Sequence, residues 1–240
     1  MRLIDFTVLT FDCYGTLIDW ETGIFNALRP LLRKATVERS RDEVLASFAR
    51  HETAQEAESP EMVYSELLAR VHRRLAAEWG IAASEANHRA FGGSVGDWPA
   101  FADSAASLCY LKQFYKLVIL SNVDRNSFAE SGKRLGVAFD AVYTAEDIGS
   151  YKPDLKNFRY MVHALKQSGH AEHDILHIAQ SLFHDHGPAN AVGLRSAWID
   201  RRGGAAGSGA TPPPPAGARY DFRFASMAEL VEAHRDELRS

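Results

Sequence analysis

Short apolar runs recur along the chain, and stretches with a helical repeat of apolar positions separate them. The runs are mostly apolar throughout rather than alternating, which is typical of strands that are covered on both faces. Because strands and helices alternate, we expect an α/β fold, namely a Rossmann-like doubly wound parallel sheet. The predicted strands are residues 6–11, 116–122, 141–145, 174–180 and 195–200. The predicted helices between and after them are 103–115, 124–136, 154–169 and 226–240.

The region 21–96 interrupts this alternation. It has helical patterns rich in Ala, Glu and Arg and no convincing strand. We therefore expect a core made of residues 1–20 and 97–240, with a cap of four or five helices inserted after the first strand. A cap in that place could build a substrate pocket and exclude water from it. Within the core, residues 203–218 are rich in Gly and Pro, which favours a flexible loop.

Composition excludes several classes of protein. The chain has 240 residues, of which 46% are hydrophobic, and a net charge of −4 without a block of like charge. We therefore expect no nucleic acid or membrane as a partner. No signal-peptide pattern and no apolar stretch of roughly 18–20 residues is present, so a cytoplasmic location is expected. Cys13 and Cys109 form no metal-binding or disulfide pattern.

Polar residues stand where the predicted strands end. In open parallel sheets, ligands bind beyond the carboxyl ends of the strands. The first strand leads to Asp12, whose carboxylate would be costly to bury without a partner. Other polar residues follow the second and fourth strands or precede a proline: Ser121, Asn122, Gln180, Ser181, Asp185 and Lys152. Each alone could be a helix cap or a surface residue, but their convergence predicts a catalytic site.

Four motifs resemble those of the haloacid dehalogenase (HAD) superfamily. They are "DCYGT" (12–16), "LSN" (120–122), "YKPD" (151–154) and "HDH" (184–186), in family order along the whole chain. A helical insert after the first motif also fits the family. The resemblance implies a hydrolase with an α/β core, a helical cap and an aspartate nucleophile at Asp12.

Position 14 bears on the branch of the family. Phosphatases of this superfamily carry a second aspartate there, which protonates the leaving group, whereas this chain has Tyr14. A phenol with a reference pKa near 10 is a poor general acid and base. A leaving halide needs no proton, and "DxYGT" resembles the L-2-haloacid dehalogenase (type II) branch. That branch works without a metal or other cofactor.

The resemblance implies hydrolysis of short (S)-2-haloacids to (R)-2-hydroxyacids through an ester of Asp12. Lys152 and Ser121 would hold the nucleophile, Thr16 would brace its loop, and Asp185 would complete the catalytic set. The implied substrate-binding and halide-binding residues are Tyr14, Trp20, Asn122 and a cap arginine, for which Arg50 fits best by position. The resemblance also leaves a homodimer open.

Some positions depart from the family pattern. Gln180 and Leu182 stand where a serine and an asparagine usually precede the aspartate, and Phe158 replaces a tyrosine. The asparagine is associated with positioning water, so Leu182 bears on ester hydrolysis. His184, next to Asp185, could act as a general base or face solvent. Gln180, Ser181 and His184 are therefore auxiliary candidates.

Two other functions remain open at this stage. The first is a phosphatase acting on a small phosphate ester, with Mg²⁺ held by Asp12, a backbone carbonyl and Asp185. Tyr14 speaks against it. The second is a weakly catalytic relative that binds a small acid or a protein partner through its cap.

Overall fold

The computed structural model describes residues 1–203, 210–211, 217 and 219–240. The stretch 203–218, which we expected to be a flexible loop, therefore falls mostly outside the described residues. No helix in the described ranges is long and apolar enough to cross a membrane.

A six-stranded sheet forms the centre of the core, and the pairing of neighbouring strands is parallel throughout. The α/β class is thus confirmed. The strand order is β3-β2-β1-β4-β5-β6. The strands are β1 (Val8–Phe11), β2 (Lys116–Ser121), β3 (Ala141–Thr144), β4 (Ile175–Ala179), β5 (Arg195–Ile199) and β6 (Phe222–Phe224). Strand β1 lies between β2 and β4, at the point where the strand order reverses, and this is where such sheets bind ligands.

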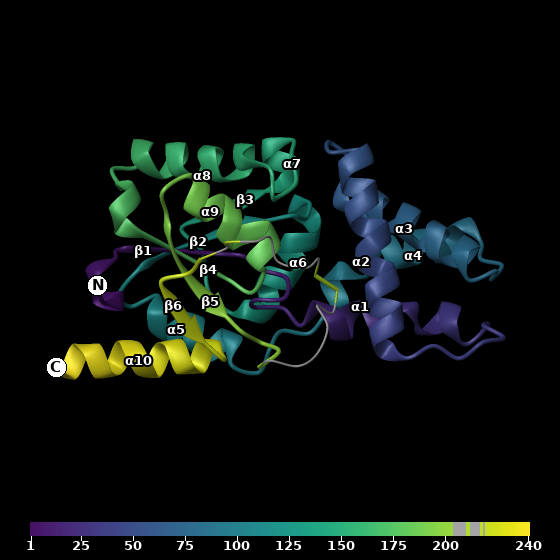
Figure 1. The fold of residues 1–240 in the computed structure, drawn as a ribbon, viewed down its shortest axis with the longest axis horizontal. Helices are drawn as coiled ribbons and strands as arrows, with labels where there is room; N and C mark the ends of the chain where they lie inside the picture. Colours follow the sequence, from purple (N-terminus) through teal and green to yellow (C-terminus); the bar gives the residue numbers. More distant parts are fainter. Residues whose placement is uncertain (204–209, 212–216, 218) are drawn as a thin grey trace.

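Helices cover both faces of the sheet (Figure 1). Leu9 and Phe11 of β1 share a buried cluster with residues of α5 (Ser104–Leu111), α6 (Arg125–Leu135) and α10 (Met227–Arg239). Val8, on the opposite face, packs in a cluster with residues of α8 (Leu155–Gln167) and α9 (Gly187–Ala191). Successive strand residues point to opposite faces, so a strand that is covered on both sides must be apolar at every position.

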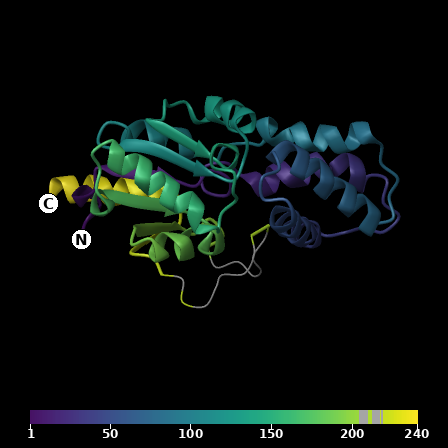
Figure 2. The ribbon, with the colours of Figure 1, turned by 90° about the horizontal axis from the view of Figure 1, so that it is seen from above.

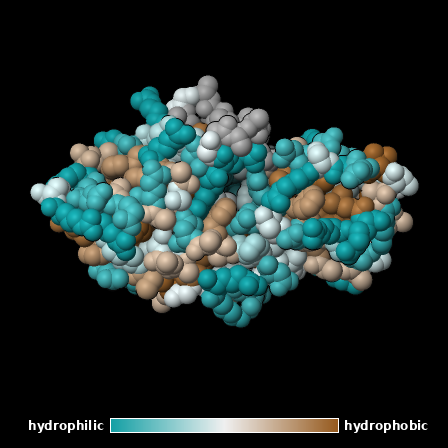
Figure 3. Space-filling view, turned by 90° about the horizontal axis from the view of Figure 1, so that it is seen from below, coloured by the Kyte–Doolittle hydropathy of each residue, from teal (hydrophilic) through white to brown (hydrophobic). Residues whose placement is uncertain are grey.

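Four α-helices follow β1 before the chain returns to the core. They are α1 (Trp20–Leu32), α2 (Arg41–Glu58), α3 (Tyr64–Glu78) and α4 (Glu85–Gly92), and a short 3₁₀-helix, η2 (Gly93–Asp97), leads back to the sheet. Figure 2 shows them as a lobe beside the carboxyl ends of the strands. Figure 3 shows hydrophilic residues over most of one face, with apolar residues gathered in places, including on this lobe.

Candidate active site

Asp12 directly follows the central strand β1 and is 6% exposed. Its Oδ1 accepts a hydrogen bond from Lys152 Nζ at 2.9 Å, and its Oδ2 accepts one from Thr16 Oγ1 at 2.7 Å. Burial raises the pKa of Asp12, Lys152 offsets part of this increase, and the charge of Asp185 adds to it. A carboxylate that is desolvated but fixed by a cation is a competent nucleophile.

Lys152 connects the two aspartates. It is 2% exposed and lies in the turn before α8, from which its Nζ also donates to Asp185 Oδ1 at 2.7 Å and to the Leu120 carbonyl oxygen at 3.0 Å. Burial opposes its charge, but Asp12 and Asp185 together hold the pKa of Lys152 above its ordinary value. The ammonium therefore stays charged, and all three of its protons are directed at these oxygens.

Asp185 lies on a short π-helix, η4 (Leu182–His186), that follows β4. Its Oδ1 also contacts His177 Nε2 at 3.0 Å, and the other ring nitrogen of His177 lies 2.9 Å from Thr10 Oγ1. Although burial opposes it, Lys152 and His177 hold the pKa of Asp185 well below its ordinary value. Its buried Oδ2 lacks a hydrogen-bond partner among the described residues. His177 was not anticipated from the sequence.

Thr16 links Asp12 to the segment after β4. Its hydroxyl donates to Asp12 and accepts a hydrogen bond from the Gln180 backbone N–H at 2.9 Å. Further along that segment, Ser181 Oγ lies 3.1 Å from His184 Nδ1. Burial lowers the pKa of His184 to about 4, so its imidazole is neutral near pH 7.

The turn after Asp12 positions Tyr14 as part of the pocket wall. The phenol oxygen of Tyr14 lies 2.8 Å from Ser131 Oγ, and its ring packs edge-on against Trp98. Burial raises the pKa of Tyr14 well above its ordinary value, which keeps the phenol protonated. Burial and the neighbouring Asp12 also raise the pKa of the Cys13 thiol, which is fully buried.

The two polar residues at the end of β2 have different surroundings. Asn122 holds the backbone of Lys152: its Oδ1 accepts from the Lys152 N–H at 2.6 Å, and its Nδ2 donates to the Lys152 carbonyl oxygen at 3.0 Å. The same Nδ2 lies 3.2 Å from Glu56 Oε1. Ser121 Oγ is buried at the pocket and has no hydrogen-bond partner in the described part of the chain.

Arg50 does not line the pocket, which corrects the placement expected from the sequence. Its guanidinium makes an ion pair with Glu78 at 2.8 Å, and its side chain is 59% exposed. Residues 50 and 52 are two apart on α2 and so point to nearly opposite sides of that helix. The side of α2 that faces the pocket instead presents Glu52 and Glu56, beside Tyr64 of α3.

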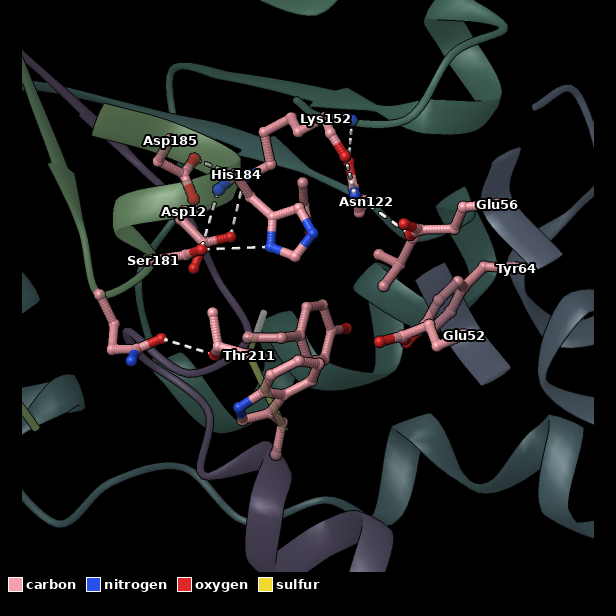
Figure 4. Close-up of a pocket in the computed structure, with 15 residues that line it drawn as sticks. Asp12, Glu52, Glu56, Tyr64, Asn122, Lys152, Ser181, His184, Asp185 and Thr211 are labelled. Carbon is pink, nitrogen blue, oxygen red and sulfur yellow. Dashed lines mark hydrogen bonds and ion pairs between the residues drawn. The ribbon is translucent and has the colours of Figure 1, made fainter. Parts of the chain in front are cut away.

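A small pocket, with a cavity volume of about 40 Å³, lies between core and cap. Figure 4 shows Asp12, Lys152 and Asp185 on one side and Glu52, Glu56 and Tyr64 on the other. The described lining residues are Asp12, Tyr14, Trp20, Glu52, Glu56, Tyr64, Ser121, Asn122, Val123, Lys152, Gln180, Ser181, His184, Asp185 and Thr211. The structure thus brings the sequence-predicted site residues together, except that Thr16 lies behind Asp12 and Arg50 lies elsewhere. Sequence reasoning missed five lining residues, namely Glu52, Glu56, Tyr64, Val123 and Thr211.

The described residues contain no group of three or more His, Cys, Asp or Glu side chains placed to hold a metal ion. Three of the four carboxylate oxygens of Asp12 and Asp185 are engaged by Lys152, Thr16 or His177. Asp185 Oδ2 is the carboxylate oxygen of this pair that has no hydrogen-bond partner among the described residues.

Solved structures of known proteins share this architecture. The L-2-haloacid dehalogenase PA0810 matches with 22% identity and a TM-score of 0.74, covering 98% of this chain and 100% of that one. The L-2-haloacid dehalogenase from Xanthobacter autotrophicus matches with 18% identity and a TM-score of 0.75, covering 96% and 98%. The HAD-hydrolase YfnB from Bacillus subtilis, bound to magnesium, matches with 20% identity and a TM-score of 0.74, covering 97% and 98%.

At these identities the likeness shows the fold alone. None of the curated proteins matches the chain. The model of the haloacid dehalogenase-like hydrolase family, however, matches residues 6–178. This match spans most of the chain and includes Asp12, Ser121 and Lys152, so the chain belongs to the haloacid dehalogenase-like hydrolases.

Proposed function

We propose that this hydrolase cleaves the carbon–halogen bond of a short (S)-2-haloacid and releases the (R)-2-hydroxyacid. The observation that supports it most is the environment of Asp12. This buried carboxylate is held by Lys152 and faces a small pocket in which a protonated phenol, Tyr14, occupies the position of the phosphatase acid. A site without an acid at that position suits a leaving group that departs as a stable anion.

In the first step, a carboxylate oxygen of Asp12 attacks C2 from the side opposite the halogen. A carbon–oxygen bond forms, the carbon–halogen bond breaks, and the halide leaves with the bonding electron pair, which inverts C2. No proton moves. The hydroxyl of Ser121 and the backbone N–H groups of the turn at Cys13 and Tyr14 are the donors for the substrate carboxylate.

In the second step, water attacks the carbonyl carbon of the Asp12 ester. The oxygen from water enters Asp12, and the 2-hydroxyacid leaves with the former carboxylate oxygen. The Oδ2 of Asp185, which lacks a partner among the described residues, accepts a hydrogen bond from that water. The neutral imidazole of His184 accepts a proton from the water and returns it to the departing alkoxide oxygen, so that the 2-hydroxyacid leaves protonated at this oxygen. In this proposal these two groups together replace the asparagine whose position is occupied by Leu182.

The decisive experiment uses water labelled with heavy oxygen. Under single-turnover conditions with L-2-chloropropionate, we expect chloride release and a mass increase confined to the peptide that contains Asp12. Asp12→Asn should release no chloride while keeping the native circular dichroism spectrum. Near-normal turnover by Asp12→Asn, or label found only in the hydroxyacid, would rule out the ester mechanism.

A parallel assay distinguishes the phosphatase alternative. We propose that no cofactor takes part, so a chelator should leave chloride release unchanged, and 4-nitrophenyl phosphate should not be hydrolysed with or without Mg²⁺. Phosphatase activity that disappears in chelator and returns with Mg²⁺ would contradict the proposal.

A further inference from the structure

The side of the pocket opposite Asp12 carries two carboxyl groups, which we call the acidic wall and define as Glu52 and Glu56 of α2. Glu52 is 5% exposed, and its Oε1 accepts a hydrogen bond from the Tyr64 hydroxyl at 2.6 Å. Glu56 Oε1 accepts one from Asn122 Nδ2 at 3.2 Å. Figure 4 shows both side chains directed from the cap toward the core residues of the site.

The acidic wall is not balanced by cations of the pocket. Among the described lining residues, Lys152 is the one with a permanent positive charge, and its ammonium is bound to Asp12 and Asp185. Arg50, on the same helix, is paired with Glu78 outside the pocket. Burial accordingly raises the pKa of Glu52 to about 7, and burial together with the charge of Glu52 raises that of Glu56 well above its ordinary value.

Such a wall discriminates between ligands by charge. A second carboxylate or a phosphate on the cap side would find no cation there, and its charge would raise the pKa of both wall carboxyls further. An ammonium would supply the missing cation and favour the charged form of both. The donors available to an anion, Ser121 Oγ and the turn after Asp12, lie on the core side. The pocket is therefore polarised, with anion-binding groups at the core and cation-binding groups at the cap.

We propose that the substrate is a 2-haloacid that also carries an ammonium group, which binds between Glu52 and Glu56. This inference rests on the proposed function and names its substrate class. With the carboxylate at Ser121 and C2 at Asp12, an amino group one carbon beyond C2 is directed toward the cap. The smallest such molecule is 3-amino-2-chloropropionate.

The first test compares chloride release from the (S) enantiomers of 3-amino-2-chloropropionate and 2-chloropropionate. We expect kcat/KM to favour the amino compound by about tenfold or more. Glu52→Gln and Glu56→Gln each keep a hydrogen-bond acceptor but remove the charge, so each should reduce this ratio. Glu58→Gln is the matched control, because Glu58 lies on the same helix but is exposed and paired with Arg74, and its ratio should equal that of the unchanged protein.

Equal or greater kcat/KM for 2-chloropropionate, or an unaltered ratio in both wall variants, would overturn the inference and leave the proposed function standing. A second test does not depend on turnover: binding of 3-aminopropionate and of propionate to the unchanged protein, measured by calorimetry. Tighter binding of 3-aminopropionate that is lost in the wall variants supports the acidic wall even if neither haloacid reacts. Binding of propionate that is as tight or tighter contradicts it.

Discussion

At the scale of single residues, most hydrogen-bonding groups around Asp12 are already bound to one another, and these bonds hold the site in one geometry. Lys152 and Thr16 together bind both carboxylate oxygens of Asp12, and this fixes the orientation of the carboxylate at the pocket. Asn122, expected from the family to receive halide, binds the Lys152 backbone instead. Asn122 would therefore act on the reaction indirectly, by holding Lys152 in position.

Thr16→Val tests this view of positioning. The variant loses the bond to Asp12 and the bond from the Gln180 N–H while keeping nearly the same volume. We expect kcat for chloride release to fall about 10–100-fold with little change in KM, because a hydrogen bond to a charged group is worth roughly 1.5–3 kcal/mol. Thr16→Ser should restore most of the loss. An unchanged kcat in the valine variant would show that the orientation of Asp12 does not depend on this hydroxyl.

Tyr14→Phe tests whether the phenol takes part in the chemistry. The Tyr14 hydroxyl is hydrogen-bonded to Ser131 Oγ, and the raised pKa of the phenol keeps it protonated. We expect kcat/KM for chloride release to stay within about threefold, with a stability loss of roughly 1 kcal/mol for the missing hydrogen bond. A loss of about 10²–10⁴-fold would identify the phenol as a proton donor or acceptor, since general acid–base groups contribute that much.

At the scale of elements, the rotational phase of α2 decides which residues the cap presents to the site. Its buried residues are Val44, Leu45, Phe48, Ala49, Glu52 and Gln55. A buried stripe with a helical repeat thus includes Glu52, and a glutamate that is buried in such a stripe indicates a special environment. Arg50 lies off this stripe, on a side of α2 that does not face the pocket.

The junction of α1 with the core gives a prediction at this scale. A Cβ added to Gly23 would lie 2.2 Å from Trp98 Cγ, and Trp98 packs against Tyr14 of the pocket. We expect Gly23→Ala to lower the free energy of unfolding by about 1–3 kcal/mol, as overpacking does. In Gly132→Ala, the control within α6, the new Cβ would meet Phe128 at an ordinary 3.5 Å, and a gain of roughly 0.5–1 kcal/mol is expected. Denaturant unfolding measures both, and equal effects would contradict the clash.

The sequence predicted most of the sheet, because strands that are buried on both faces are apolar at nearly every position. The five predicted runs correspond to β1–β5 within one or two residues at most ends. Strand β6 was missed because Phe222–Phe224 is short and follows the Gly- and Pro-rich stretch. Motif spacing also predicted that Asp12, Lys152 and Asp185 converge, and the structure brings the three side chains into contact. The acidic wall could not be located in the same way, because the contact of cap and core depends on tertiary packing.

At the scale of the whole molecule, buried histidines couple folding to pH. Burial lowers the pKa of His72, His184 and His186 to about 4 each. The unfolded chain binds protons at these residues near pH 6.5, whereas the folded chain does so only near 4, so stability is lost as pH falls through this window. Glu52 acts oppositely: its pKa of about 7 stabilises the folded state at low pH, and this contribution is lost as pH rises through 7.

The three histidines outnumber the two glutamates of the acidic wall, whose raised pKa values act in the opposite direction. We therefore expect Tm to fall by roughly 3–5 °C between pH 6.5 and pH 5. His186 offers a specific check, since its ring nitrogens contact Ser196 Oγ and the Ala179 carbonyl away from the chemistry. His186→Gln should reduce the slope of Tm against pH, whatever it does to Tm itself. A slope unaltered by this substitution would contradict the assignment of His186.

The burial of Cys13 has a practical consequence for labelling studies. Haloacetates and haloacetamides alkylate thiolates, and a modified peptide spanning residues 12 and 13 would ordinarily be ambiguous between sulfur and oxygen. The raised pKa of the Cys13 thiol keeps it protonated and unreactive, whereas Cys109 is exposed. Replacing Cys109 by serine therefore removes the exposed thiol, and we expect a transient adduct on that peptide, formed before water hydrolyses it, to be the ester of Asp12.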